Sequence, residues 1–487
     1  MTDAPPASDF GGAPGASEPG LGTAPPAAGL PESATPRTGA FDAFHPPERD
    51  LIDDCVHCGF CLPTCPTYSV WGEEMDSPRG RIYLMQQGLE GEPMTDSMVL
   101  HIDRCLGCMS CVTACPSGVQ YNKLIEATRA QIERRYDRPA SQRLLRNAIF
   151  AVFPYPRRLR ALRGPLRLYQ RSGLPKALRR SGILDRLPQT LRSMESLAPP
   201  LSTPTRLPRR IPARGTRRAV VGLLTGCVQS VFFSDVNAAT ARVLAAEGCD
   251  VVIPEGQGCC GALSVHNGRE DEAARFARRT IDEFESAGVE TVVVNAAGCG
   301  SSMKEYGHLL RDDPEYAQRA ARFSARTRDV AEFLVELGPA APRHPLPMRV
   351  AYHDACHLAH AQNIRSQPRQ LLRGIPGLEL LEIAEPEICC GSAGVYNLLQ
   401  PEPARELGDR KLANILATDP DLLVTANPGC LMQVYAAAER RGRHLASAHT
   451  VMVLDASIRG LPPGALTGAP ATPDEVTDVQ AGPRSRR

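Results

Sequence analysis

Two short cysteine runs constrain this 487-residue chain more than any other feature. They read C-V-H-C-G-F-C-L-P-T-C-P at Cys55–Pro66 and C-L-G-C-M-S-C-V-T-A-C-P at Cys105–Pro116. Both fit C-x2-C-x2-C-x3-C-P, in which three thiolates hold one [4Fe–4S] cluster and the fourth cysteine ligates the neighbouring cluster. Zinc knuckles, the alternative, use two cysteines of each run and leave the other two without a role. The runs therefore predict two [4Fe–4S] clusters.

The spacing divides the eight thiolates into two sets. The predicted ligands of cluster 1 are Cys55, Cys58, Cys61 and Cys115. The predicted ligands of cluster 2 are Cys65, Cys105, Cys108 and Cys111. Gly59 and Gly107 lack a Cβ, so the loop backbone can turn tightly towards the inorganic core. Pro66 and Pro116 are expected to turn the chain away from it.

Composition and charge narrow the class of protein. The formal net charge is +1 and aromatic residues make up 5% of the chain, which argues against nucleic-acid binding. The chain starts with neither the basic nor the apolar segment of a signal peptide, and no apolar run is long enough to span a bilayer. Because cluster cysteines need a reducing compartment, we expect a cytoplasmic protein. Membrane contact should be at most peripheral, on the inner face of the cell membrane.

Residues 45–138 are predicted to form a helical two-cluster ferredoxin-type domain. Ser77 followed by Pro78 is a typical helix start, and apolar residues continue from Ile82 at helical spacing. A second helix is expected after Gly118. The basic trio consists of Arg79, Arg81 and Arg104. These side chains either offset the negative charge of the thiolate clusters or form solvated surface.

Residues 139–217 have the composition of a basic, Pro-rich linker. Eleven Arg or Lys residues and one acid lie between Arg157 and Arg192. Leu159, Leu162 and Leu166 recur among them at helical intervals, which predicts a basic amphipathic helix. Such a helix packs on an acidic partner, serves as a solvated linker, or lies on an anionic membrane surface.

Residues 218–458 contain an internal repeat, with one copy at 218–338 and the other at 346–458. Strands are expected at 219–224, 250–253 and 291–294 in the first copy, and at 348–352, 378–383 and 421–424 in the second. Helices alternate with them, as in a parallel sheet. Corresponding intervals between the cysteines differ by one residue between the copies. Each copy is therefore predicted to be an α/β domain built around a C-C-G block.

The cysteines of each copy follow strand ends, where sites form in open α/β sheets. They are Cys227, Cys259, Cys260 and Cys299 in the first copy, and Cys356, Cys389, Cys390 and Cys430 in the second. Each set holds a further cluster, forms a redox-active thiol pair, or is a degenerate structural site. His353, Asp354 and His357 flank Cys356 as candidate proton acceptors or ligand-orienting groups. Cys249 lies outside the pattern and is interpreted as an ordinary buried thiol.

Residues 1–44 are rich in Pro, Ala, Gly and Ser, and residues 459–487 are rich in Pro, Ala, Gly and charged residues. They are predicted to be disordered tails. The fold class is therefore α+β and multidomain, with a helical two-cluster domain followed by two α/β cysteine-rich repeats.

The order of these features resembles that of the iron–sulfur subunits of bacterial glycolate oxidase, also called glycolate dehydrogenase. The resemblance covers residues 45–458 and rests on both C-P runs, both C-C-G blocks and S-P-R-G-R at Ser77–Arg81. A wider family includes the small subunit of anaerobic glycerol-3-phosphate dehydrogenase and the heterodisulfide reductases. In the reductases each block ends in C-x2-C. This chain has Ser302 and Gln433 at the matching positions, which argues against disulfide reduction.

The resemblance implies an oxidoreductase complex in which this chain relays electrons and carries no catalytic residue. FAD-binding partner subunits would oxidise glycolate to glyoxylate, and electrons would leave toward a quinone-type acceptor. Gly256–Gly261 fits the G-x-G-x-x-G spacing, but it contains the C-C-G cysteines. FAD is therefore expected only on the partners. Lactate or glycerol 3-phosphate as the partner's substrate, and a heterodisulfide-reductase-like thiol enzyme, are the alternatives.

Overall fold

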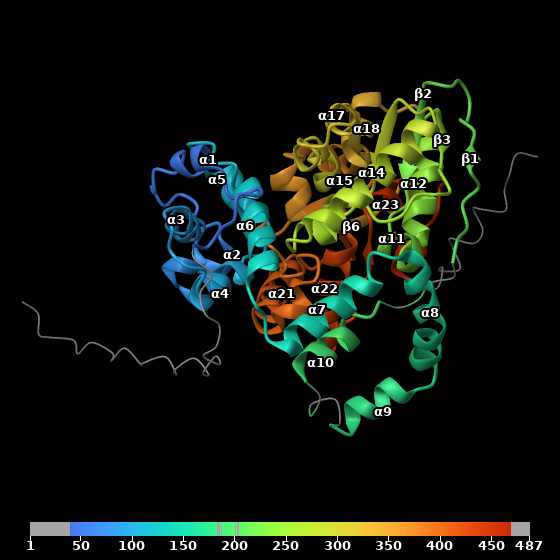
Figure 1. Ribbon diagram of the computed structural model, residues 1–487. Coiled ribbons are helices and arrows are strands. Elements are labelled where there is room, and N and C mark those ends of the chain that lie inside the picture. Colours follow the sequence, from blue (N-terminus) through green and yellow to red (C-terminus); the bar gives the residue numbers. More distant parts are fainter. Residues whose placement is uncertain (1–38, 183–185, 187, 200, 202–203, 469–487) are drawn as a thin grey trace, which may run out of the picture. The chain divides into compact units, whose positions relative to one another are not determined.

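Short helices surround both cysteine runs in the N-terminal part of the chain (Figure 1). The computed structural model describes residues 39–182, 186, 188–199, 201 and 204–468. The elements of the helical module are α1 (Arg49–Asp53), α2 (Pro66–Trp71), η1 (Glu74–Asp76), α3 (Pro78–Leu89), α4 (Asp96–Arg104), α5 (Ser110–Ala114) and α6 (Tyr121–Arg135). The prediction of a module built on helices is confirmed.

Local sequence explains where these helices begin. The Ser77 hydroxyl accepts a hydrogen bond from the Gly80 N–H, and Pro78 occupies the first turn of α3. Ile82 and Met85 on α3 and Ile125 on α6 are buried in one apolar core. Pro66 likewise opens α2 directly after the last cysteine of the first run. The helix starts expected from Ser77 and Gly118 are therefore confirmed.

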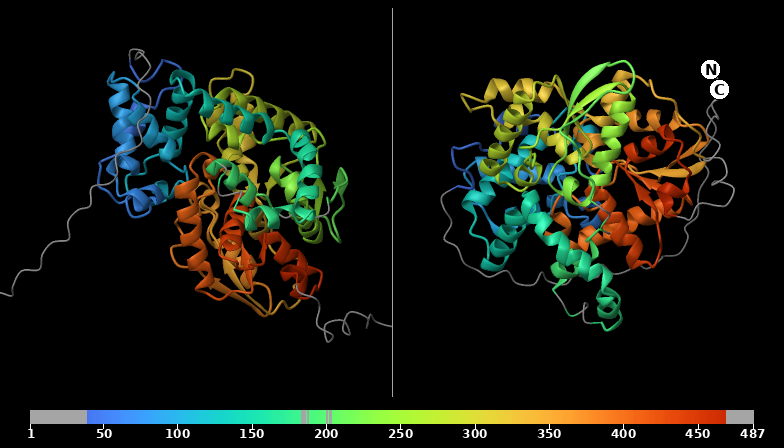
Figure 2. Two further views of the ribbon diagram at one scale, coloured as in Figure 1. Left: turned by 90° about the horizontal axis from the view of Figure 1, so that it is seen from below. Right: turned by 90° about the vertical axis from the view of Figure 1, so that its right-hand side faces the viewer.

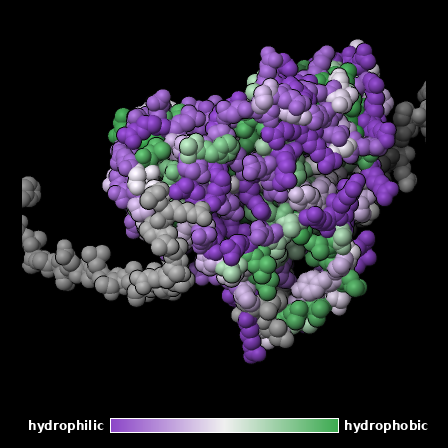
Figure 3. All heavy atoms as spheres, viewed as in Figure 1, coloured by the Kyte–Doolittle hydropathy of each residue, from purple (hydrophilic) through white to green (hydrophobic). Residues whose placement is uncertain are grey.

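Four helices follow in the predicted linker. They are α7 (Ala140–Val152), α8 (Pro156–Arg171), α9 (Leu174–Arg180) and α10 (Gln189–Ser196). Leu159 of α8 is buried, whereas Leu144 and Leu168 are 73% and 72% exposed. Figure 3 shows hydrophobic and hydrophilic side chains next to each other over this region, at the lower right. The predicted amphipathic helix is thus present, and most of its length faces solvent.

The first repeat contains a five-stranded sheet with strand order β1-β3-β2-β4-β5. Its strands are β1 (Arg210–Ile211), β2 (Ala219–Leu224), β3 (Cys249–Val252), β4 (Thr291–Val294) and β5 (Thr327–Asp329). All neighbours run parallel except β1, which pairs antiparallel with β3. The helices of this repeat are α11 (Val228–Phe232), α12 (Ser234–Ala246), α13 (Ala262–Val265), α14 (Glu270–Ser286), α15 (Ala297–Lys304), α16 (Tyr306–Leu309), α17 (Ala317–Ala325) and α18 (Val330–Leu337).

The second repeat contains a four-stranded parallel sheet with order β7-β6-β8-β9. Its strands are β6 (Met348–Tyr352), β7 (Leu378–Glu382), β8 (Leu422–Val424) and β9 (Ser447–Ala448). Its helices are η3 (His357–Ala361, a π-helical turn), α19 (Ser366–Arg373), α20 (Tyr396–Leu399), α21 (Pro401–Leu416), α22 (Pro428–Arg440), α23 (Thr450–Ile458) and α24 (Gly464–Thr467). Figure 2 shows helices around both sheets. The order β3-β2-β4-β5 of the first repeat recurs as β7-β6-β8-β9, so the predicted repeat is structural.

The two repeats share one apolar core. Val221 and Val293 from the first sheet belong to the same buried cluster as Val350 and Leu422 from the second. The central strands of both sheets are buried and apolar, as expected for parallel strands covered on both faces. Burial of this shared core stabilises the two repeats as a unit, with their cysteine loops at the carboxyl ends of the strands.

Three short strands were not expected from the sequence, namely β1, β5 and β9. Each has only two or three residues, too few to show a strand periodicity. β1 comes from the predicted linker, so the end of that segment belongs to the first sheet. The remaining six strands match the predicted positions to within one residue.

Both segments predicted to be disordered tails include residues that pack against the folded part of the chain. Ala40 is fully buried, and the Asp42 N–H donates to the Gln131 side chain of α6. At the other end, α24 lies inside the segment assigned to the tail. Contacts with α6 and with β9 hold these residues, although their composition resembles that of a linker. The rest of both tails, residues 1–38 and 469–487, lies outside the described residues.

Candidate metal centres

The two cysteine loops of the helical module share one backbone conformation. The third and fifth residues of each loop have positive φ: His57 (53°) and Gly59 (85°) in the first, Gly107 (65°) and Met109 (63°) in the second. Glycine adopts this left-handed conformation freely, whereas another L-residue is destabilised there by roughly 1–2 kcal/mol. Each loop thus has glycine at only one of its two left-handed positions. The tight turns expected at both glycines are present.

The cysteines predicted for cluster 1 lie around one cavity. Its walls include Cys55, Cys58, Cys61 and Cys115, together with Cys111 from the second loop. Cys58 is exposed, and its neighbours Val56 and Phe60 are 68% and 67% exposed. The cavity therefore lies at the surface of the module, with two large apolar side chains beside it.

Cys65, the last cysteine of the first run, lies near cysteines of both loops, because its thiol acts on the pKa of Cys61 and of Cys111. It is buried, and its sulfur lies 3.2 Å from the Thr67 hydroxyl. Burial raises the pKa of Cys111 well above its usual value, and the neighbouring thiols Cys108, Cys105 and Cys65 raise it further. The structure therefore places Cys65, Cys105 and Cys108 near Cys111, and Cys61 of the other predicted set is near Cys111 as well.

Positive charge makes Cys105 different from the other thiols of this set. Burial by itself raises its pKa, but the guanidinium groups of Arg81 and Arg129 outweigh that effect, so the pKa of Cys105 is lowered. The Gly107 N–H and the Tyr121 hydroxyl donate to its sulfur over 3.3 and 3.6 Å. These groups stabilise the thiolate, which is the form that ligates iron.

The basic trio has divided roles. Arg81 is 1% exposed, and it pairs with the buried carboxylate of Asp76 at 3.3 Å. Arg104 pairs with the other oxygen of Asp76 at 2.8 Å. Arg79 donates to the His57 carbonyl in the first loop over 3.1 Å. The burial of Arg81 beside the thiols supports the charge-offset interpretation for that residue and excludes solvated surface.

The first repeat gathers its four cysteines at the carboxyl edge of its sheet. The sulfurs of Cys227 and Cys259 are 3.7 Å apart. The thiols of Cys259 and Cys299 both contact Cys260, which lowers the pKa of Cys260. Contacts with Cys227 and Cys260 raise the pKa of Cys259, and the contact with Cys260 raises that of Cys299. The four thiols thus form one continuous group.

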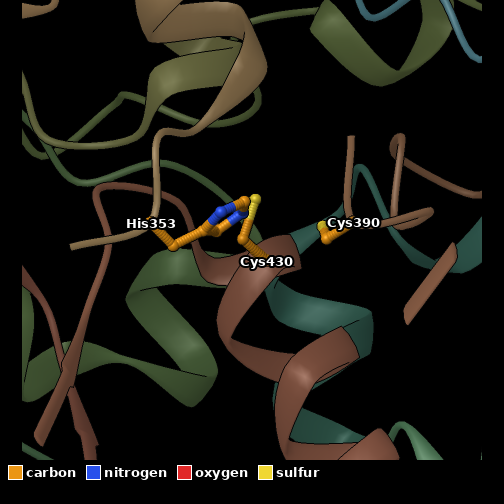
Figure 4. Close-up of side chains that lie close together, drawn as sticks. All are labelled: His353, Cys390 and Cys430. Carbon is orange, nitrogen blue, oxygen red and sulfur yellow. The ribbon is translucent and has the colours of Figure 1, made fainter. Parts of the chain in front are cut away.

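The second repeat has the same arrangement and adds an imidazole. The sulfurs of Cys356 and Cys389 are 3.8 Å apart, and contacts with Cys389 and Cys430 lower the pKa of Cys390. Figure 4 shows His353 next to Cys430, with Cys390 across a short gap. The ligand atoms of His353, Cys390 and Cys430 all lie within 4.8 Å of one another, and all three residues are buried.

The second repeat also contacts the cluster 2 loop. Cys108 belongs to the same apolar cluster as Cys389, and Cys356 packs against this cluster. Burial raises the pKa of Cys108, and Cys356 is the next largest cause of the rise. The ring of His357 donates from Nε2 to the Gly107 carbonyl over 2.8 Å. The cluster 2 loop therefore packs directly against the cysteine loops of the second repeat.

Family models match three parts of the chain. The "4Fe-4S dicluster domain" matches residues 51–119. The "Glycolate oxidase iron-sulfur subunit, linker region" matches residues 141–198. The "Cysteine-rich domain" matches twice, at residues 221–304 and 350–435. The matched segments follow the helical module, the linker helices and the two repeats in order.

Curated relatives cover most of the chain. It is 42% identical over 404 residues to the "Probable glycolate oxidase iron-sulfur subunit" of Bacillus subtilis (strain 168), with 81% of this chain and 90% of the relative covered. It is 38% identical over 401 residues to the "Glycolate oxidase iron-sulfur subunit" of Escherichia coli (strain K12), with 81% and 92% covered. The chain belongs to this family. The chain is 32% identical over 241 residues to "Lactate utilization protein A" of Shouchella clausii (strain KSM-K16), with 48% of this chain and 98% of that relative covered.

Membership of the glycolate oxidase iron–sulfur subunit family makes this protein an electron-transfer subunit of an oxidoreductase. The dicluster-domain match makes it an iron–sulfur protein, and the convergent thiols at residues 51–119 fit [4Fe–4S] chemistry. Among the described residues, no helix combines the length and apolar character needed to cross a membrane.

The positions that carry an extra cysteine in heterodisulfide reductases are buried but polar here. Ser302 is 5% exposed and lies in α15. The Gln433 amide donates to the Ala404 carbonyl over 2.6 Å and accepts from Asn397 over 3.1 Å. Because the Gln433 side chain already has hydrogen-bond partners within the fold, it belongs to the packing of α21 and α22.

Sequence reasoning missed several residues that surround the cysteine loops. Arg129 donates to the Cys105 carbonyl and, over 2.7 Å, to the His266 carbonyl of the first repeat. Asp76 gathers two arginines and His101, whose Nδ1 lies 3.0 Å from its carboxylate. The only signal in the sequence was the position of Arg129 next to the buried face of a predicted helix. A lone arginine there is otherwise typical of solvated surface.

Proposed function

We propose that this protein relays electrons within a glycolate oxidase complex. In this proposal Cys55, Cys58, Cys61 and Cys115 hold one [4Fe–4S] cluster, and Cys65, Cys105, Cys108 and Cys111 hold a second. When bound, the clusters supply one-electron transfer between a two-electron flavin oxidation and the acceptor. FAD-binding partner subunits oxidise glycolate to glyoxylate, and the electrons leave toward a quinone-type acceptor. The relatives named as glycolate oxidase subunits support this assignment.

The observation that carries the proposal is the contrast in exposure between the two cysteine sets. The first set lies at the surface beside Val56 and Phe60, whereas Cys65, Cys105 and Cys108 are buried. Exposed apolar side chains of this size are frequent at interaction sites. We assign Val56 and Phe60 to the contact with the flavoprotein. The cluster proposed for the second cysteine set is then shielded from water and passes electrons onward through the protein interior.

The chain's own residues prepare the second set for a bound cluster. Arg81 and Arg129 place positive charge beside Cys105, which counteracts the repulsion among four converging thiolates. Thr67 and Ser110 lie 3.2 and 3.1 Å from the sulfurs of Cys65 and Cys108. Such hydrogen bonds to ligand sulfurs are among the features that set the potential of a cluster.

The test compares the isolated chain with the complex assembled from the chain and its partner flavoproteins. Under anaerobic conditions, we expect glycolate to reduce the clusters in the complex, seen by low-temperature EPR, and to leave them oxidised in the isolated chain. Iron and acid-labile sulfide should be near eight each per chain. Turnover of glycolate by the isolated chain with an artificial acceptor would contradict the proposal.

A docking variant tests the assigned surface. Phe60→Asp places a charge on the apolar patch, and we expect at least a tenfold slower reduction of the clusters by the flavoprotein, with unchanged iron content. Tyr83→Asp is the matched control, because Tyr83 is an exposed aromatic residue of the same module that does not line the cluster 1 cavity. Equal slowing by both variants would remove Phe60 from the proposed contact.

A second candidate keeps the relay and changes the partner's substrate to lactate. It is favoured by the similarity to lactate utilization protein A over 48% of this chain. The same reduction experiment with lactate in place of glycolate distinguishes the two. Faster reduction of the clusters by lactate would favour this candidate.

A further inference from the structure

The carboxyl edge of the second sheet holds a buried histidine that the electron relay does not use. His353 follows β6 directly and is 1% exposed. Neither nitrogen of its ring has a hydrogen-bond partner. A buried imidazole without hydrogen-bond partners is unfavourable, so a group that satisfies it adds stability. The position of this ring therefore needs an explanation beyond packing.

The surroundings of His353 are those of a metal site. The imidazole and the sulfurs of Cys390 and Cys430 lie within 4.8 Å of one another. They come from three segments far apart in sequence, which meet at the ends of neighbouring strands (Figure 4). In a tetrahedral zinc site the ligand atoms are about 3.5–3.8 Å apart, given bond lengths of about 2.0–2.3 Å. Side-chain movements of about 1 Å would bring all three to one ion.

We propose that His353, Cys390 and Cys430 bind a single divalent ion of the zinc type. Two thiolates and one imidazole form a soft-to-borderline donor set, which zinc prefers over the oxygen ligands that suit calcium or magnesium. A cubane cluster instead takes one thiolate at each iron and needs no imidazole. The three protein ligands leave one coordination position, and the thiol of Cys389, which contacts that of Cys390, is a candidate fourth ligand.

The first repeat provides an internal comparison. Leu224 and Tyr352 hold equivalent places, because they pair with Val294 and Val424 at the ends of β4 and β8. The next residue is Thr225 in the first repeat and His353 in the second. The Thr225 N–H donates to the Gln257 side chain over 2.7 Å. The first repeat therefore has the four thiols without an imidazole, and we assign the ion to the second repeat.

The experiment measures zinc and iron per chain in the full-length protein, purified anaerobically and incubated with excess zinc before desalting. We expect about one zinc per chain in the wild type. X-ray absorption at the zinc edge should show sulfur together with imidazole nitrogen. His353→Ala and Cys430→Ser should each lower the zinc content at least tenfold without changing the iron content. Cys299→Ser, the matched change in the first repeat, should retain the zinc.

Three results would overturn the site. They are less than a tenth of a zinc per chain in the folded wild type, a zinc environment without sulfur, or loss of iron on His353→Ala. The last result would mean that the second repeat holds an iron–sulfur cluster. His353→Cys guards against failure of the alanine variant to fold, because it supplies a third thiolate. It should retain zinc and replace the imidazole signal with sulfur.

Discussion

The two cysteine-rich repeats have the same strand order and nearly the same cysteine spacing, yet they border different surroundings. The second repeat packs Cys356 and Cys389 against Cys108 of the helical module. The first repeat instead borders a cavity of about 230 Å³, whose walls include Met109 and Glu305. Burial raises the pKa of the Glu305 carboxyl. The function of a repeat therefore does not follow from its sheet alone. The elements packed against each repeat determine which groups its thiols contact.

The repeats also differ at equivalent positions within their own folds. Asp329 caps α18 after β5, with its carboxylate accepting from the Ala331 N–H over 2.8 Å. His449 caps α23 after β9, with Nδ1 accepting from the Val451 N–H over 3.1 Å. An acid and a base thus perform the same capping task. This difference and the one at Thr225 and His353 show how duplicated scaffolds diverge.

The largest expected contrast concerns the glycines of the two C-C-G blocks. Gly261 and Gly391 have φ of +89° and +85°, so alanine at either position is strained. A Cβ on Gly391 would lie 2.5 Å from the Ala404 carbonyl oxygen, whereas one on Gly261 would lie 3.0 Å from that of Ala273. We expect Gly261→Ala to lower the free energy of unfolding by roughly 1–2 kcal/mol, and Gly391→Ala by about 1–3 kcal/mol more.

Urea unfolding under anaerobic conditions measures both effects. Iron content is measured for each variant as well, because Cys389 in the same block as Gly391 packs against Cys108 of the helical module. Equal losses of stability in the two variants would mean that the second repeat relaxes around the added methyl group.

The next contrast is the response of the two caps to acid. Burial raises the pKa of Asp329 to about 7 and lowers that of His449 to about 4. Between pH 3.8 and 7 the native Asp329 binds more protons than the unfolded one, so acidification stabilises the first repeat. Between pH 4 and 6.5 the unfolded His449 binds more protons, so acidification destabilises the second. From pH 7.5 to 5.5 the free energy of unfolding should rise by roughly 2 kcal/mol through Asp329 and fall by roughly 1 kcal/mol through His449.

Asn variants separate the two caps, because Asn retains capping ability without titrating. Relative to the wild type, Asp329→Asn should lose the acid stabilisation, and His449→Asn should lose the acid destabilisation. The readout is the difference in the free energy of unfolding between pH 7.5 and pH 5.5, from urea titrations. The same pH dependence in both variants would contradict the opposite responses to acid that we expect for Asp329 and His449.

The smallest expected effect concerns the contacts of the cluster 2 loop with each repeat. Arg129 links the loop to the first repeat and carries charge, whereas His357 links it to the second through a neutral hydrogen bond. We expect Arg129→Met to lower the reduction potential of the cluster that we propose for Cys65, Cys105, Cys108 and Cys111. The shift should be on the order of 40 mV, equivalent to about 1 kcal/mol for one electron.

Redox titration followed by EPR measures this potential. Arg129→Lys should preserve most of it, because the positive charge remains. His357→Gln, which retains a hydrogen-bond donor, should shift it less than Arg129→Met. An equal shift in Arg129→Met and Arg129→Lys would show that hydrogen-bond geometry, rather than charge, sets the potential.

Features that depend on short-range spacing could be predicted from the amino-acid sequence. The cysteine runs, the start of α3 at Ser77 and the six longer strands follow from residues close together in the chain. Repetition of the C-C-G pattern likewise showed that the second half contains two related sheets. These inferences succeed because helix, strand and chelate geometry depend on local periodicity and steric limits.

Contacts between groups that are far apart in the sequence became known only from the folded structure. Arg129 reaches Cys105 and the first repeat, and Cys356 lies against Cys108. His353, Cys390 and Cys430 converge only when three strand ends come together. Packing of the shared core positions these groups, and their burial then changes their pKa values and their need for partners. Spacing along the sequence does not predict that packing, so the role that we propose for His353 could be inferred only from the folded protein.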